Sequence, residues 1–368
     1  MTAGSRAAVL RWAAVAALVL VLATLPAALA TRSADDSPVS AADLRQAVLA
    51  SGSVPFSGVA QSAGGLALPV SDQLTSVADL FSDRTTMRVW WRGPQESRVD
   101  VVTPAGETGT YLDATGTWTW EFESATATRA ARTPFALPAP PDLLPGPLAR
   151  RLLSEAADEE LSRSGARRVA GRDALGLRLT PSSAAASVEH VDVWVDADTG
   201  LPLEVQVVGP DGPPALDSRM LEVDLTAPSA DVVAFTPPVG ATVREGREAE
   251  AVLQEGSRIR PVPLPVVLAD LPRRSLDGAP SGIGLYGSGV TLLAVAPVPE
   301  RLAGALRDLL RASPGAVVDE AGVRTAAGPV GLMLVELPGR RPYVLTGTVT
   351  VDALARAAAQ LPGAGEGR

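Results

Sequence analysis

Residues 87–129 constrain the fold of this chain more than any other segment, because they alternate apolar and polar side chains between closely spaced turn signals. Trp118, Trp120 and Phe122 alternate with threonine and glutamate, so one face of that strand is aromatic and the other is polar. Glycine, proline and aspartate recur between the alternating runs at the spacing of an antiparallel meander. Such a sheet can bury one face and wet the other, so the function depends on what the apolar face covers.

The segment 188–208 carries the strongest hairpin signal of the chain. Val193 and Val195 belong to a run with valine at every second position, and a second alternating run returns after an Asp-Thr-Gly turn. The acidic residues within 196–200 superficially resemble a calcium loop. That loop needs a 12-residue spacing and a closing glutamate, which are missing here, so we interpret 196–200 as a β-turn.

Two amphipathic helices are predicted beside these strands. One covers Ala41–Ala50 after a Ser40 cap, and the other covers 148–161. The six prolines within 133–147 predict an extended segment without regular structure, and a short helix is expected near 74–81.

A second, smaller unit is predicted after a highly charged linker at 241–260. Alternation and helical periodicity predict strands at 283–296, 330–336 and 343–351, and helices at 301–311 and 351–361. The glycines of 282–289 are not followed by a helix, so they predict strand bulges or a close turn and not a phosphate cradle. Because strands and helices do not alternate strictly along the chain, the fold class is expected to be α+β.

Residues 1–30 carry a targeting signal, in which two arginines precede an apolar run that closes on an Ala-Leu-Ala sequence. This pattern predicts a secretory signal peptide, with a retained N-terminal anchor as the alternative. In both cases the rest of the chain is expected outside the cytoplasm, in a periplasm-like space or the cell envelope. Residues 31–40 are expected to form a disordered leader.

Composition excludes several classes of function. The chain has no cysteine, so disulfides, thiol nucleophiles and zinc-thiolate sites are ruled out. His190 is the only histidine and lies beside a glutamate at a predicted strand entry, where we expect a structural or surface role. The formal net charge of −9, without clusters of arginine and aromatic residues, argues against nucleic acid as a partner. We therefore predict a binding protein, not an enzyme, with no cofactor and no metal site.

Several motifs together resemble a known family. MRVWWRGP from residue 87, GTWTWEFES from 116 and VDVWVDADTGLPLEVQV from 191 resemble the large domain of the periplasmic sigma-E regulators RseB/MucB. The same domain is similar to the curved half-barrel of the lipoprotein carrier LolA. GIGLYGSGVTLLAV at 282–295 and RRPYVLTGTVTVDALARAAAQL at 340–361 resemble the small second domain of RseB, which LolA lacks.

This resemblance, which covers roughly 41–361, implies a curved antiparallel half-barrel with capping helices, plus a smaller α+β C-terminal domain. The large domain is expected at 41–240, the linker at 241–260 and the small domain at 261–362. In the family, an apolar groove lies between the sheet and the helices, where each buried CH₂ of an acyl chain contributes about 0.8 kcal/mol. The candidate residues for the inner face are Val89, Trp91, Trp118, Trp120, Val193 and Val195, whereas Trp90 and Trp194 point to the opposite face. Ordinary core packing of these side chains is the alternative to a ligand groove.

The resemblance implies an exported protein that regulates the envelope-stress response. Its partners would be a membrane anti-sigma factor and a lipid or lipoprotein acyl chain. Two alternatives stay open: a lipid or lipoprotein carrier of the LolA kind, and an envelope scaffold with a closed core and no ligand.

Overall fold

The computed structural model describes residue 12 and residues 34–65, 84–104, 106–132, 138–210, 212–246, 264–275, 282–336 and 341–361. The predicted targeting segment at 1–30, the helix near 74–81 and the part of the linker from 247 to 260 lie outside these residues. Residues 34–40 of the predicted leader have no helix or strand. No helix among the described residues is long and apolar enough to cross a bilayer.

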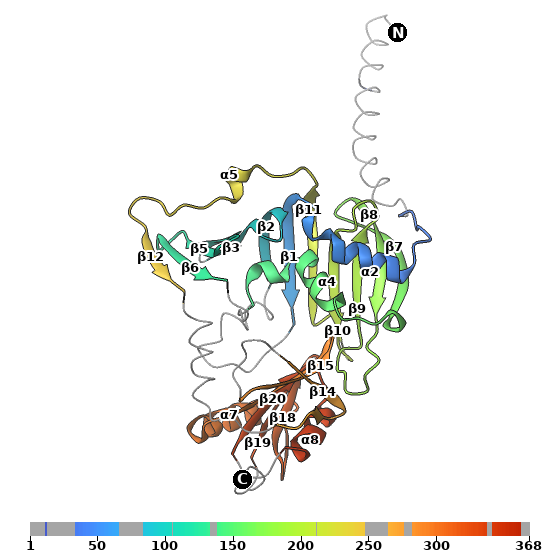
Figure 1. Ribbon diagram of the computed structural model, residues 1–368, viewed down its shortest axis with the longest axis vertical. Helices are drawn as coiled ribbons and strands as arrows, with labels where there is room; N and C mark the ends of the chain where they lie inside the picture. The colour runs from blue at the N-terminus through green and yellow to red at the C-terminus, as the bar shows by residue number, and fades with distance from the viewer. Residues whose placement is uncertain are drawn as a thin grey trace, which may run out of the picture.

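The large domain is built on one open, curved sheet, as the meander and hairpin patterns predict (Figure 1). In order across the sheet, its strands in the described chain are β12 (Thr242–Glu245), β6 (Thr126–Ala131), β5 (Gly116–Glu121), β4 (Gly106–Asp113), β3 (Glu96–Thr103), β2 (Arg84–Gly93), β1 (Phe56–Gly64), β11 (Leu216–Asp224), β10 (Pro202–Val208), β9 (His190–Asp196), β8 (Arg172–Leu179) and β7 (Leu161–Val169). Neighbouring strands are antiparallel, except that β12 runs parallel to β6. The sheet is therefore an antiparallel half-barrel with β12 and β7 as its edges.

One face of this sheet is covered by helices, and we call it the helix face. α2 (Ala41–Ala50) and α4 (Pro145–Leu153) lie on it, together with the 3₁₀ turns η1 (Ser51–Ser53) and η3 (Pro140–Leu143) (Figure 1). α2 begins at the predicted cap, where Ser40 Oγ accepts the backbone N–H of Asp43 at 3.1 Å. Leu44 and Val48 of α2 pack with the valines of β9 in one buried cluster.

The opposite face is crossed by the segment 225–246, which we call the strap. The strap leaves β11, forms the short helix α5 (Ala230–Val233), and ends in β12 at the far edge of the sheet (Figure 1). α5 contacts β2 and β3, and Arg92 of β2 donates to the carbonyl oxygen of Pro228 at 2.6 Å. We call the face beneath it the strap face.

The small domain has its own antiparallel sheet, and in the described residues two helices pack against it. In order across the sheet, its strands in the described chain are β13 (Val267–Leu268), β14 (Leu271–Arg274), β15 (Gly284–Ser288), β16 (Thr291–Pro297), β20 (Tyr343–Gly347), β19 (Val330–Val335), β18 (Gly322–Ala327) and β17 (Val317–Asp319). α7 (Glu300–Ala312) and α8 (Val351–Ala359) pack on β18 and β19. Each helix caps a separate buried cluster, so the domain has a core of its own.

Several sequence predictions need correction. The predicted strand at 283–296 is a hairpin of β15 and β16, because Gly287 and Gly289 adopt positive φ angles of 90° and 56° and turn the chain. The predicted close turn at these glycines is thereby confirmed. The predicted linker begins later than 241, because Thr242–Glu245 forms β12 and belongs to the large domain.

The boundaries of α4 also differ from the prediction. The helix begins inside the proline-rich segment, since Pro145 occupies the first helical position, where no N–H is needed. It ends at Leu153, and a 3₁₀ turn η4 (Asp158–Glu160) leads directly into β7. The prediction of a helix through residue 161 and of a structureless segment up to residue 147 was therefore wrong.

Candidate functional site

Four of the six predicted groove residues lie on the helix face and are buried there. Val193 and Val195 of β9 are 0% exposed and pack with α2 and α4. Val89 and Trp91 of β2 are 0% and 5% exposed and belong to a neighbouring cluster with Phe56. The rings of Phe56 and Trp91 stack with centroids 6.2 Å apart. In this structure, side chains of the protein itself fill the space against these four residues.

The other two predicted groove residues, Trp118 and Trp120, lie on the strap face. Cross-strand partners share a face of a sheet, and the register pairs Trp90 with Arg98, Arg98 with Tyr111, and Tyr111 with Trp118. Trp118 therefore lies on the same face as Trp90 and on the opposite face from Trp91. The expectation that all six residues line one wall is wrong for Trp118 and Trp120.

On the helix face, the cross-strand partners that run from β2 to β6 become polar toward the β12 edge of the sheet. Val89 pairs with Val99, and the same row continues through Thr110, Thr119 and Thr128. The helix face thus changes from valine to threonine between β3 and β4. A ligand on the helix face of β4, β5 and β6 would contact hydroxyl groups and not tryptophan rings.

The aromatic face of the meander is covered by the strap. Phe235 lies with its ring centroid 4.6 Å from that of Tyr111, 5.6 Å from that of Trp118 and 5.9 Å from that of Trp120. These residues and Ala127 form a separate apolar cluster of the large domain. The aromatic face therefore covers a core that the chain supplies itself.

Arginines extend this cluster across the strap face. The guanidinium carbon of Arg98 lies 4.8 Å from the ring centroid of Trp90 and 5.0 Å from that of Tyr111. Arg129 lies over Trp118 at 5.5 Å. Each cation is held over the negative face of a ring, so this ladder connects five neighbouring strands across the strap face.

Trp194 lies on the strap face, as predicted. The guanidinium carbon of Arg167 is 4.0 Å from its ring centroid, and Arg167 Nη2 also lies 2.6 Å from Glu204 Oε2. Glu204 is 5% exposed, and this burial raises the pKa of its carboxyl group despite the neighbouring arginine. His190 Nε2 lies 3.6 Å from Oδ2 of the largely buried Asp192, so the histidine belongs to a network of polar side chains.

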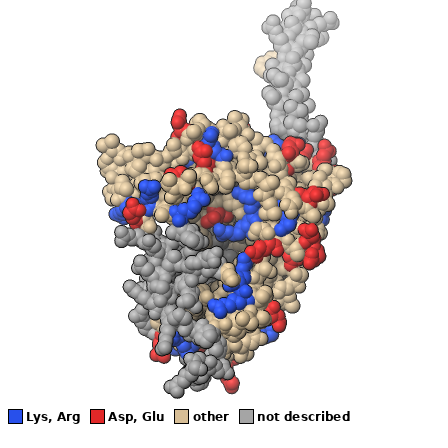
Figure 2. Space-filling view, in the orientation of Figure 1, with Lys and Arg blue, Asp and Glu red and all other residues tan. Residues whose placement is uncertain are grey.

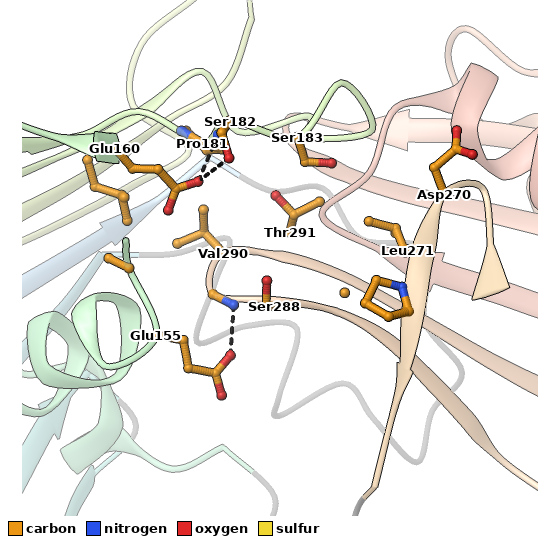
Figure 3. A pocket seen from close by; sticks show the side chains of 15 residues that line it. Glu155, Glu160, Pro181, Ser182, Ser183, Asp270, Leu271, Ser288, Val290 and Thr291 are labelled. Carbon is orange, nitrogen blue, oxygen red and sulfur yellow. Dashed lines mark hydrogen bonds between the residues drawn. The ribbon is translucent and has the colours of Figure 1, made fainter. Parts of the chain in front are cut away.

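A cavity of about 200 Å³ lies between the two domains (Figure 3). Glu160 and Ser183 of the large domain line it, together with Val290 and Thr291 of the small domain. Glu160 Oε1 accepts both the backbone N–H and the hydroxyl of Ser182 at 2.8 Å, so its carboxylate is already partnered. Among the described residues, no group of three His, Cys, Asp or Glu side chains is arranged to hold a metal ion.

Glu155, just after α4, holds the small domain at this junction. Its carboxylate accepts the backbone N–H of Gly289 at 2.8 Å and pairs with both terminal nitrogens of Arg274. The Gly289 N–H, followed by Arg274, lowers the pKa of the Glu155 carboxyl. Ser187 adds a second connection, because its backbone N–H donates to the carbonyl oxygen of Thr348 at 3.3 Å.

We expect the Glu155→Ala substitution to loosen this junction. Gly289 loses the acceptor of its backbone N–H, so hydrogen exchange at Gly289 should accelerate about tenfold, the factor for a bond worth about 1.4 kcal/mol. Glu159 is an exposed neighbour outside the junction, and Glu159→Ala is the matched control. Unchanged exchange at Gly289 in Glu155→Ala would show that the Glu155 carboxylate does not hold this turn, and would leave the contacts of residues 185–187 with the small domain to hold the junction.

The fold defines the class to which the chain is similar: an open antiparallel half-barrel with capping helices, here followed by a second domain. A LolA superfamily protein from Nitrosomonas europaea shares 12% identity with the chain, with a TM-score of 0.25, and the match covers 54% of this chain and 98% of that one. No protein-family model and no curated protein matches the sequence.

The two-domain arrangement has similar solved structures as well. The Pseudomonas aeruginosa MucA/MucB complex matches at 17% identity with a TM-score of 0.49, covering 88% of this chain and 98% of that one. A second structure, MucB in complex with MucA(peri), matches with the same values. These are the proteins to which the sequence motifs pointed, and at this identity the likeness concerns the fold.

Proposed function

We propose that this protein is an exported, non-enzymatic binding protein that regulates a membrane anti-sigma factor in the manner of RseB/MucB. The proposal combines the motif resemblance with the signal at 1–30, which directs the chain out of the cytoplasm. MucB, a protein of similar fold, is found in complex with MucA.

The observation that carries the proposal is the second domain, with its own core and its bonded junction to the half-barrel. A carrier of the LolA kind needs only the half-barrel. Here the chain adds a sheet with α7 and α8 packed on it, and fixes this domain to the large domain through Glu155 and Ser187 among other contacts. Two domains held at a bonded junction offer a composite surface to a protein partner.

We further propose that the helix face is the lipid-sensing surface of this regulator. Val89, Trp91, Val193 and Val195 would line it, and an acyl chain would take the place of side chains from α2 and α4. Each buried CH₂ of the acyl chain would contribute about 0.8 kcal/mol, and this gain would offset the loss of that packing. A helix face that binds acyl chains would also serve the second candidate function, a lipid or lipoprotein carrier.

Affinity capture from detergent-solubilised membranes of the native host tests the regulatory proposal. We expect the tagged protein to recover a single-span membrane protein whose cytoplasmic part binds a sigma factor. An exported protein of the same host with the same tag serves as the control. Recovery of transporter components would favour the carrier, and recovery of neither would favour the scaffold.

Native mass spectrometry of the gently purified protein tests the lipid-sensing surface. Co-purified acyl species would support it, and a strictly ligand-free protein that also takes up no added lipid would contradict it. Affinity capture tests the protein partner and native mass spectrometry tests the lipid ligand, so either proposal can fail without the other.

A further inference from the structure

Arg150 of α4 differs from most arginines of the large domain. Arg163, Arg172 and Arg178, for example, each pair with an aspartate. Arg150 is half-buried, and no acidic side chain among the described residues pairs with it. Figure 2 shows basic side chains gathered over the face of the molecule on which α4 lies.

The guanidinium of Arg150 lies beside two glycines, Gly146 and Gly52. An ideal Cβ on Gly146 would lie 3.2 Å from Arg150 Nη1, and one on Gly52 would lie 3.6 Å from Nε. A side chain at Gly146 would crowd the cation, whereas one at Gly52 would make an ordinary contact with it. Gly146 therefore leaves room for the guanidinium, which lies between α4 and η1.

Two further contacts position the cation without neutralising it. Its central carbon lies 5.6 Å from the ring centroid of Trp91, which is itself fixed because its indole N–H donates to the carbonyl oxygen of Gly52 at 2.9 Å. Arg150 Nη1 donates to Ser51 Oγ over a long 3.4 Å. An arginine has five N–H donors, so most of its hydrogen-bonding capacity is unused by the described protein.

This arrangement is costly in the free protein. A buried charge is normally paired, since the loss of hydration must be offset by a counter-charge. Burial lowers the pKa of Arg150, and no carboxylate in the part of the chain that the structure describes opposes that effect. A held, half-buried and unpaired guanidinium is therefore suited to receive an anionic group from outside the chain.

We propose that Arg150 anchors an acidic side chain, aspartate or glutamate, of the protein partner. This inference rests on the proposed regulatory function and names the chemistry of its partner. Arginine and tryptophan are the residue types that most often dominate binding energy at protein interfaces, and here Arg150 lies against Trp91.

A single acidic side chain is a better match for this one unpaired cation than an anionic membrane is. Membrane surfaces are bound by clusters of several exposed basic residues. The neighbouring Arg151 is instead 3.7 Å from Asp142, and the chain carries a net charge of −9, which repels an anionic bilayer. One carboxylate that approaches Arg150 interacts mainly with this local cation.

The test compares Arg150→Met with Arg151→Met in the full chain. Methionine keeps the packing of the stem against Trp91 and removes the charge. We expect Arg150→Met to lower the affinity for the captured partner by roughly 10- to 100-fold, which is the effect of losing a charge-assisted hydrogen bond. Arg151→Met should bind like wild type. The free Arg150→Met protein should melt at the same temperature as wild type or higher, because an uncompensated charge has been removed.

A second arm needs no partner. Acetate, inorganic phosphate and phosphatidylglycerol vesicles are titrated at constant ionic strength while the side-chain N–H signal of Arg150 is followed by nuclear magnetic resonance. Saturation by acetate supports the site, even if wild type captures no anti-sigma factor and the proposed function fails. Equal partner binding by both variants, a lowered melting temperature with unchanged affinity, or saturation by the vesicles alone would overturn the inference.

Discussion

Replacing Trp120 with aspartate is expected to lower the free energy of unfolding by at least about 4 kcal/mol. Truncation of a buried tryptophan alone costs about 3–5 kcal/mol, and the new carboxylate would be buried beside Phe235 without a partner. Chemical denaturation followed by tryptophan fluorescence measures the loss. The effect should appear first in the strap, which loses the core that holds it to β4–β6.

Phe122→Asp is the matched control for this substitution. Its ring lies 5.8 Å from that of Trp120, yet Phe122 is 42% exposed, so the cost should stay below about 1 kcal/mol. Acyl species that bind wild type should still bind any folded Trp120→Asp protein, because Trp120 lies on the strap face. Selective loss of lipid with an intact strap would contradict that placement.

Replacing Arg172 with alanine should cost about 3 kcal/mol of stability. Its guanidinium pairs with Asp196, which is 1% exposed, and also lies 3.1 Å from Asp198. The substitution leaves a buried carboxylate with only the Thr199 donors. The control is Arg168→Ala, whose 3.3 Å pair with Asp173 is exposed and should contribute less than about 1 kcal/mol.

The same carboxylate makes stability depend on pH. Although burial acts in the opposite direction, Arg172 and Thr199 together hold the pKa of Asp196 below the ordinary value of 3.8. A depressed pKa contributes stability that is complete above the ordinary value and is lost as the pH falls through the folded value. Urea midpoints between pH 7 and pH 2 should therefore fall less steeply in Asp196→Asn than in wild type. If the urea midpoints of the two proteins fall in parallel as the pH is lowered, other groups are responsible for the acid sensitivity.

Local sequence patterns predicted much of the architecture. The alternating meander, the hairpin at 188–208 and the capped helix Ala41–Ala50 depend on neighbours in the chain, and the structure has all three. The turn after Asp196 is also confirmed, because its carboxylate accepts the N–H of Thr199 and Gly200 has a φ of 73°. The α+β class follows from these local elements.

The faces of the meander could not be predicted in the same way. Alternation fixes which residues share a face within one strand, but the register between strands depends on turn geometry and bulges. The irregularity between Trp91 and Gly93 and the pairing of Tyr111 with Trp118 decide the outcome here. Phe235, which covers the aromatic face, is more than a hundred residues away from Trp118 in sequence. Local sequence patterns therefore could not predict this contact.

The long-range consequence of the strap is mechanical. The chain leaves the large domain at β12, on one edge of the half-barrel, but the small domain is bonded near α4 and the β8–β9 connection, toward the other edge. The small domain is thus tethered at one end of an arc and docked at the other (Figure 1). A ligand that flattens or tightens the arc therefore changes the distance between β12 and the bonded junction, so the position of the small domain and the curvature of the sheet are coupled by geometry.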